Sequence, residues 1–188
     1  MIDKVLTLPI IHERRLRDPS KLFEVEQLDL EFSNGVKRTY ERMKTRGLGA
    51  VIIVPMLDDD TVLLVREYAA GLHHYEIGLP KGRLEANETA LEGAQRELKE
   101  EIGYGAKSLV ELTRLSLAPG YMTHVTRIVL ARDLYPEKLP GDEPEELQVV
   151  PWSIHNLLAI AAREDCTEGR SIAAMYIARD FLAAEKAS

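Results

Sequence analysis

The chain has 188 residues, 45% of them apolar, which is enough for one substantial core and excludes a large multidomain assembly. Its net charge of −7 argues against a general affinity for nucleic acid, and a polyanionic substrate would need a bridging cation. A single cysteine, Cys166, excludes an intramolecular disulfide, and no cysteine or histidine cluster has the spacing of a structural zinc site. The chain contains neither a signal peptide pattern nor a run of roughly 20 apolar residues. We therefore expect a cytoplasmic protein that does not insert into membranes.

The first predicted element is a β-hairpin. Residues 22–32 alternate apolar and charged side chains, Ser33-Asn34-Gly35 has turn chemistry, and residues 36–43 resume the strand pattern. We assign residues 1–46 to a small β-rich N-terminal element and residues 47–188 to the main domain.

The main domain is predicted to mix strands and helices. Two apolar strands at 50–57 and 61–66 are joined by an aspartate-rich turn. A helix follows at 90–102, and the remaining predicted elements are strands near 109–116, 127–133 and 148–152, a proline- and acid-rich loop at 134–146, and helices around 154–163 and 171–186. This order predicts an α/β domain.

The helix at 90–102 has well-defined ends. Thr89 and Glu92 fit a capping box at its start, and Gly103 fits the stop position at its end. Helical periodicity predicts a core-facing stripe made of Leu91, Ala94, Leu98 and Ile102.

The same periodicity puts Glu97 and Glu101 together on a neighbouring flank, with Glu100 beside them. Carboxylates held so close repel one another unless a cation lies between them, and such hard oxygen ligands suit Mg²⁺ or Mn²⁺. For these three residues alone, a solvated acidic helix face would be the default interpretation.

The wider spacing favours a cation site. The fixed residues Gly82, Glu88, Arg96-Glu97-Leu98, Glu100-Glu101, Gly103 and Tyr104 resemble the signature of Nudix hydrolases, G-x5-E-x7-R-E-U-x-E-E-x-G-U, in which U is a bulky apolar residue. The resemblance implies an α/β/α sandwich with a mixed β-sheet, behind the small N-terminal hairpin. It also implies a magnesium-dependent enzyme that hydrolyses a diphosphate bond in a nucleotide.

The resemblance assigns a role to each residue of the signature. Glu97 and Glu101 are the expected principal metal ligands, and Glu100 is a further ligand or a base. The carbonyl oxygen of Lys81 is an additional candidate ligand. Arg96 and Glu88 are expected to form an ion pair that braces the loop, and Gly82 to let the backbone pass close to the metal.

Features outside the signature are similar to the branch of the family that acts on ADP compounds. Ala118-Pro119-Gly120 follows the signature at the spacing typical of ADP-ribose hydrolases, although a simple strand-ending turn would look the same. Arg66 and Glu76 are candidates for binding phosphate and ribose, or are surface residues. Hairpin residues Phe23, Arg38 and Arg42 are expected to enclose substrate in a homodimer.

The acidic loop carries two further candidates. Glu143 and Glu145 precede the strand at 148–152 and are expected either to close over the metal as ligand or general base, or to lie in a solvated loop. The sequence does not choose the catalytic base among Glu100, Glu143 and Glu145.

The predicted function is hydrolysis of ADP-ribose, NADH or short diadenosine polyphosphates to AMP and a second phosphorylated product. Two alternatives stay open. One is hydrolysis of another diphosphate, in a nucleoside triphosphate, capped RNA or sugar nucleotide. The other is a non-catalytic sensor that binds a nucleotide, although such modules usually lose the carboxylates that this chain keeps.

Overall fold

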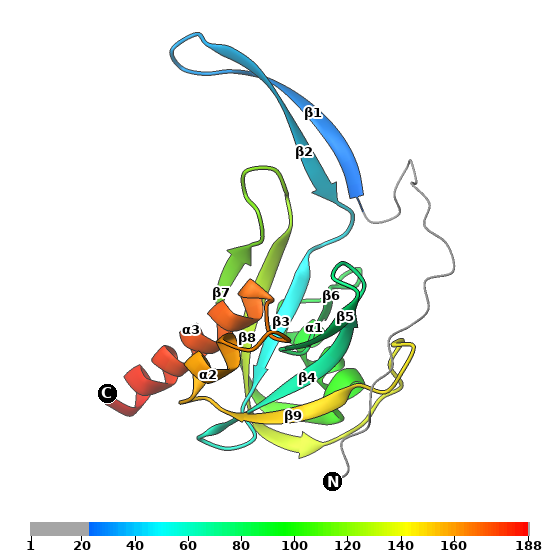
Figure 1. The fold of residues 1–188 in the computed structure, drawn as a ribbon, viewed down its shortest axis with the longest axis vertical. Helices are drawn as coiled ribbons and strands as arrows, with labels where there is room; N and C mark the ends of the chain where they lie inside the picture. Colours follow the sequence, from blue (N-terminus) through cyan, green and yellow to red (C-terminus); the bar gives the residue numbers. More distant parts are fainter. Residues whose placement is uncertain (1–22, 188) are drawn as a thin grey trace.

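The computed structural model describes residues 23–187, so the part of the expected N-terminal element before Phe23 lies outside the described residues. Two β-sheets lie between helices, with α2 and α3 covering one face and α1 the other (Figure 1). The expected mixed sheet enclosed by helices is confirmed. No helix within residues 23–187 is long and apolar enough to span a membrane.

The larger sheet has four strands in the order β6-β3-β8-β7. Strands β3 and β8 pair in parallel, whereas the other two pairs are antiparallel. Their bounds are Ala50–Pro55 for β3, Lys81–Arg83 for β6, Tyr104–Ser116 for β7 and Val125–Pro136 for β8. The predicted strands near 109–116 and 127–133 are therefore present and longer than expected, because their pairing extends to Tyr104↔Pro136.

The smaller sheet is antiparallel, in the order β5-β4-β9. It consists of Thr61–Ala69 (β4), His74–Gly78 (β5) and Gln148–Ser153 (β9). The short strands β5 and β6 were not predicted, because their glycines and charged residues conceal the strand alternation in the sequence.

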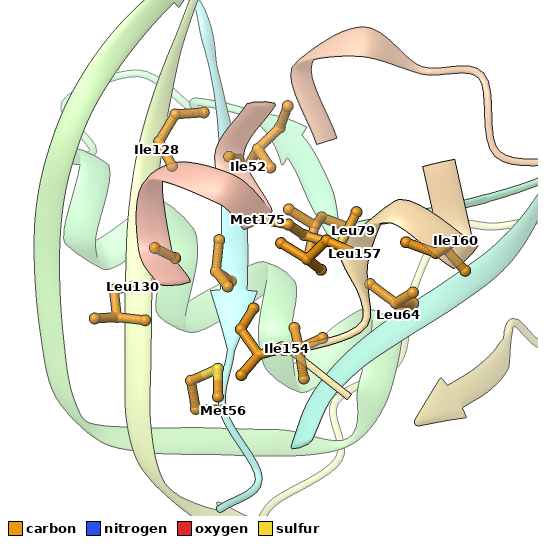
Figure 2. Packing of buried hydrophobic residues seen from close by; sticks show 14 of the residues in the cluster. Ile52, Met56, Leu64, Leu79, Ile128, Leu130, Ile154, Leu157, Ile160 and Met175 are labelled. Atoms are coloured by element: carbon orange, nitrogen blue, oxygen red, sulfur yellow. The ribbon is translucent and has the colours of Figure 1, made fainter. Parts of the chain in front are cut away.

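The core is split between the two faces of the sheets, and strand alternation decides the split. Figure 2 shows the cluster on the face that α2 and α3 cover. On β3, Ile52 and Val54 pack beneath α2 and α3, whereas Val51 and Ile53 pack against α1. Strands β4 and β8 alternate in the same way. Consecutive buried residues of one strand therefore pack against helices on opposite sides of the sheets.

The helix bearing the signature differs from the prediction in two respects. An α-helix over Ala90–Glu97 (α1) continues as one π-helical turn over Leu98–Ile102, where the Gly103 amide reaches back five residues to Leu98. The predicted core stripe was wrong at Leu91, which is 38% exposed. Ala90 is buried in its place, because every fourth residue from Ala90 to Ile102 faces the sheet.

Both predicted helix ends are confirmed. Thr89 and Glu92 form the reciprocal capping box, and Gly103 adopts the left-handed conformation with φ 74°. Of the two later helices, α3 spans Gly169–Ala187 as expected, but α2 is only Leu157–Ala161. The chain at Ile154 is not helical, because its amide bonds to Asp60 at the β3–β4 turn.

The N-terminal hairpin projects from the body of the molecule (Figure 1). Strands β1 (Phe23–Glu31) and β2 (Lys37–Thr45) pair over nine positions, as predicted. At the base, Met43 donates to the Tyr121 carbonyl at 2.7 Å and accepts from the Thr123 amide at 3.0 Å. These bonds join β2 to the loop between β7 and β8.

Candidate active site

The backbone of β6 passes directly over the carboxylate of Glu97. A Cβ atom added to Gly82 would lie 1.8 Å from Glu97 Oε1, closer than any side chain permits. At Gly82 the backbone therefore lies against the carboxylate of Glu97, and only glycine allows this approach.

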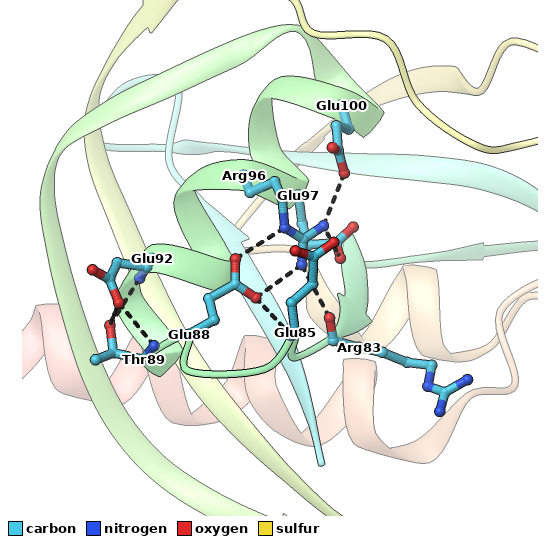
Figure 3. A network of polar contacts seen from close by, with 8 residues as sticks. All are labelled: Arg83, Glu85, Glu88, Thr89, Glu92, Arg96, Glu97 and Glu100. Carbon is cyan, nitrogen blue, oxygen red and sulfur yellow. Dashed lines mark hydrogen bonds and ion pairs between the residues drawn. The ribbon is translucent and has the colours of Figure 1, made fainter. Parts of the chain in front are cut away.

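Arg96 ties the loop before the helix to the acidic cluster (Figure 3). Its Nε lies 2.9 Å from Glu88 Oε1, which confirms the expected ion pair. Its Nη1 lies 2.7 Å from Glu97 Oε1 and 2.9 Å from Glu100 Oε2. Its Nη2 donates to the Arg83 carbonyl at 3.0 Å. The hydrogen bond from Arg96 lowers the pKa of Glu88, so that this carboxylate stays ionised as a brace.

The two expected principal ligands are the most deeply buried acidic groups of the cluster. Glu97 is 8% exposed and Glu101 is 7% exposed. Burial raises the pKa of Glu101 to about 8, and the charge of Glu97 adds to the effect, even though Lys81 opposes it. Burial also raises the pKa of Glu97, in spite of its bond to Arg96. Two buried carboxylates with raised pKa values form a site that a cation would stabilise.

The donor set fits a hard divalent cation. The Lys81 amide donates to Glu101 Oε2 at 3.1 Å. This bond holds Glu101 beside β6, where the carbonyl oxygen of Lys81 is a predicted metal ligand. The groups gathered here are oxygens, as Mg²⁺ and Mn²⁺ prefer. Among residues 23–187, no three acidic, histidine or cysteine side chains already converge as a metal cage. Instead, Arg96 Nη1 holds one oxygen each of Glu97 and Glu100, which leaves their second oxygens for a ligand.

The acidic loop forms the wall opposite the helix. It encloses a cavity of about 370 Å³ together with Glu97, Glu100 and Glu101, and Glu143 lines both this cavity and an adjoining one of about 590 Å³. Burial, together with the charges of Glu67 and Asp142, raises the pKa of Glu143. The loop and the helix thus line one cavity, which agrees with the first of the two alternatives that the sequence left open for Glu143 and Glu145.

Comparison with known proteins agrees with this geometry. A sequence model of the NUDIX domain matches residues 47–170, and a model of the NudE-type Nudix hydrolase N-terminal domain matches residues 9–42. The chain belongs to the Nudix hydrolase family.

Individual relatives lie within the same family. The chain is 45% identical to the ADP compounds hydrolase NudE of Escherichia coli, over 96% of this chain and 97% of that protein. It is 27% identical to an ADP-ribose pyrophosphatase of Bacillus subtilis, over 80% and 82% of the two chains. A crystal structure of an ADP compounds hydrolase superimposes with a TM-score of 0.81, at 45% identity, covering 97% of this chain and 98% of the other. The fold of this Nudix hydrolase is therefore shared over nearly its whole length.

Two residues of the Nudix site were missed in the sequence. Lys81 Nζ forms an ion pair with Glu67, and the Tyr75 hydroxyl donates to Glu145 Oε1 at 2.5 Å. Alternation along β4 contained a signal for Glu67, since Leu63 and Val65 face α1 and Glu67 continues that face. No sequence signal pointed to Tyr75, because its partner lies 70 residues away.

Arg66 and Glu76 are engaged elsewhere in this Nudix domain. Arg66 lies on the opposite face of β4 from Glu67, and its Nη2 lies 3.5 Å from Asp165 Oδ2. Glu76 is buried and accepts from the Thr167 amide at 2.8 Å, although it also borders a cavity of about 740 Å³. Their substrate-binding roles stay predictions.

The predicted hairpin ligands lie apart from the carboxylates within one protomer. Arg42 pairs with Glu26 at 2.6 Å, and Arg38 lies near the exposed end of the hairpin. Phe23 borders a cavity of about 250 Å³ at the hairpin base. Pro119 and Gly120 lie in the loop between β7 and β8, whose Tyr121 carbonyl joins β2.

Proposed function

We propose that this chain hydrolyses the diphosphate linkage of ADP compounds, releasing AMP and a second phosphorylated product. ADP-ribose, NADH and short diadenosine polyphosphates are the substrates that we expect. One observation carries the proposal: the backbone at Gly82 lies against Glu97 beside the buried carboxylate of Glu101, in a chain that is 45% identical to an ADP compounds hydrolase.

We assign the cation site to Glu97, Glu101 and the carbonyl oxygen of Lys81, with Glu100 as a further ligand. The expected cation is Mg²⁺, for which Mn²⁺ would substitute. When bound, it neutralises charge on the two phosphates and makes an attacking water more acidic. Arg96 contributes by holding Glu97 and Glu100 on the same side of the helix.

We assign the general base to Glu143. Glu100 is held by Arg96 and Glu145 by Tyr75, whereas no hydrogen bond or ion pair within residues 23–187 engages the Glu143 side chain. Glu143 also lines both cavities that adjoin Glu97. A carboxylate in this position would accept the proton of a water aligned for attack on phosphorus. Glu145 would keep the loop closed over the site and would serve as a metal ligand if it leaves Tyr75.

We further propose that the active protein is a homodimer. The exposed face of the hairpin carries Leu30, Phe32 and Tyr40, at 40%, 46% and 47% exposure. An isolated two-stranded hairpin is only marginally stable in water, so a second copy that covers this face would stabilise it. Arg38 is paired with Leu30 on the same face, so it would then contact the partner subunit and bind substrate held there.

The first experiment is a substrate panel with Mg²⁺. AMP release would be measured from ADP-ribose, NADH and diadenosine di- and triphosphates, with ATP, GDP-mannose and capped RNA as substrates of the competing reactions. We expect turnover of the ADP compounds, reduced at least about 100-fold in Glu97→Gln, Glu101→Gln and Glu143→Gln. Glu164→Gln removes the same charge from an exposed position and should keep full activity.

Each outcome has a distinct meaning. Preferential turnover of ATP, GDP-mannose or capped RNA would contradict the substrate assignment but leave the cation site intact. Binding of ADP-ribose without hydrolysis would favour a non-catalytic sensor. Full activity in Glu143→Gln would mean that Glu143 is not the general base, and that Glu100 or Glu145 takes this role.

A further inference from the structure

Arg83 has a positive charge that no acidic side chain in the described chain neutralises. Within residues 23–187, Arg83 and Arg38 are the arginines that make no ion pair. Over the same range, the only hydrogen bond of the Arg83 guanidinium runs from Nη2 to the Arg46 carbonyl at 3.1 Å. Arg83 is exposed, and its side chain extends away from Arg96 and the glutamates around it (Figure 3). It is therefore available to an anionic ligand.

Two cavities meet at Arg83. It lines the cavity of about 590 Å³ that contains Glu97 and Glu100, and also the cavity of about 250 Å³ at the hairpin base. The second cavity has the opposite charge character, because Arg46 and Arg170 line it as well. A ligand that extends from the carboxylates towards the hairpin would pass from an acidic to a basic wall at this residue.

The other cations near this path are already engaged. Lys81 pairs with Glu67, Arg46 Nη2 lies 2.9 Å from Glu24, and Arg170 Nε lies 2.6 Å from Glu168. Arg96 holds its three glutamates. Arg83 is thus the cation on this path whose guanidinium can form two parallel bonds to a phosphate without first breaking an ion pair.

The position of Arg83 in the chain limits where the phosphate lies. It directly follows Gly82, whose backbone touches Glu97, so its side chain begins beside the proposed cation site. A phosphate bound by Arg83 would therefore be the third in the phosphate bridge of the ligand, next to the two held at the cation site. Beyond it, Phe23, Leu117 and Met122 line the second cavity and give an apolar surface to a nucleoside.

We propose that Arg83 binds the additional phosphate of dinucleotides whose nucleosides are joined by three phosphates, and so sets the preference for them over those joined by two. The inference rests on the proposed function, since it takes the cleaved diphosphate to lie at Glu97 and Glu101. Arg83 is a specificity-determining residue in this scheme, because the two phosphates of a shorter bridge would not reach it.

The test compares two substrates that differ by one phosphate, diadenosine triphosphate and diadenosine diphosphate. In Arg83→Gln, kcat/KM for the triphosphate should fall about tenfold, mainly through KM, and kcat/KM for the diphosphate should change less than threefold. Arg83→Lys keeps the charge and should retain part of the preference. Lys107→Gln removes a positive charge from an exposed position on β7 and should leave both substrates unaffected.

A calorimetric measurement separates failure of this inference from failure of the proposed function. Inorganic tripolyphosphate and pyrophosphate would be titrated into wild-type protein and Arg83→Gln with Mg²⁺ present. Selective weakening of tripolyphosphate binding is expected, even if neither dinucleotide is hydrolysed. Equal weakening of both anions, no change in either, or an unchanged substrate ratio in an active Arg83→Gln enzyme would overturn the role of Arg83.

Discussion

At the scale of single residues, the site depends on Gly82, because glycine has no side chain. Glu97 is buried beneath the backbone of Gly82, so that the closest wall of the site is a peptide group rather than a methyl group. The carboxylate oxygens of Glu97 therefore lie near main-chain carbonyl oxygens, which can also bind a cation. A substitution at Gly82 should therefore affect chemistry more than folding.

We predict that Gly82→Ala lowers kcat/KM about 100-fold, because the new methyl group displaces Glu97 by an ångström or more. The thermal midpoint should change by only a few degrees, since Glu97 can move towards the cavity of about 590 Å³ that it lines. Steady-state kinetics and thermal unfolding check both expectations.

Gly71→Ala is the matched control, since a Cβ at Gly71 meets nothing within 4 Å. It should preserve both kcat/KM and the midpoint. Normal kinetics in Gly82→Ala would show that Glu97 does not need its present position.

At the scale of elements, the acidic loop is held against the domain by a side chain from β5. The Tyr75 hydroxyl donates to Glu145 at 2.5 Å, and the ring of Tyr75 packs edge-on against Tyr68 at a centroid distance of 5.9 Å. A hydrogen bond to a carboxylate is stronger than one between neutral groups. Tyr75 therefore stabilises the closed arrangement of the loop that bears Glu143.

We predict that Tyr75→Phe increases amide hydrogen exchange across residues 141–147 roughly tenfold, because the loop loses a charge-assisted bond. Exchange in β3, at the centre of the larger sheet, should stay unchanged. Mass spectrometry of exchanged peptides measures both regions.

Tyr68→Phe is the control for this change. Its hydroxyl contacts His73 Nδ1 at 2.6 Å and makes no bond to the loop. Equal exchange of the loop in both variants would mean that the Tyr75–Glu145 bond does not hold it.

At the scale of the whole molecule, the hairpin is the part that the domain core does not support. It extends beyond the two sheets and is joined to them mainly at its base, through the bonds of Met43 (Figure 1). Its face with Tyr40 and Phe32, whose rings lie 6.4 Å apart, is exposed in one protomer. This arrangement supports the proposed dimer.

We predict that light scattering gives about twice the monomer mass of 21.2 kDa for the wild-type protein. Tyr40→Lys should raise the dissociation constant of the dimer roughly 30-fold, because a charge replaces an aromatic side chain in the interface. Gln27→Lys places the same charge on the other face of the hairpin, opposite Glu41, and should leave the dimer intact. A wild-type protein that is monomeric at micromolar concentration would contradict the proposed homodimer.

Much of the fold and of the site was predictable because the deciding interactions are local. The capping box, the stop at Gly103 and the spacing of Glu97 and Glu101 all lie within one or two helical turns, and the structure has each of them. The continuous apolar run of β3 predicted a strand, and the structure buries that strand on both sides. Errors arose where a neighbour in space intervened, as at Ile154, which bonds to Asp60 and shortens the predicted helix.

The amino-acid sequence by itself determined the α/β class, the helix that carries the acidic cluster and the kind of ion that the cluster suits, since these follow from periodicity and from carboxylate chemistry. Apart from the Arg96–Glu88 pair, which the family resemblance implied, only the tertiary structure decided which charges neutralise one another. Arg42 pairs with Glu26, Arg66 with Asp165, and Lys81 with Glu67, whereas Arg83 has no acidic partner within residues 23–187. The physical reason is that ion pairing depends on distances of a few ångströms between strands remote in sequence, which composition and spacing do not specify.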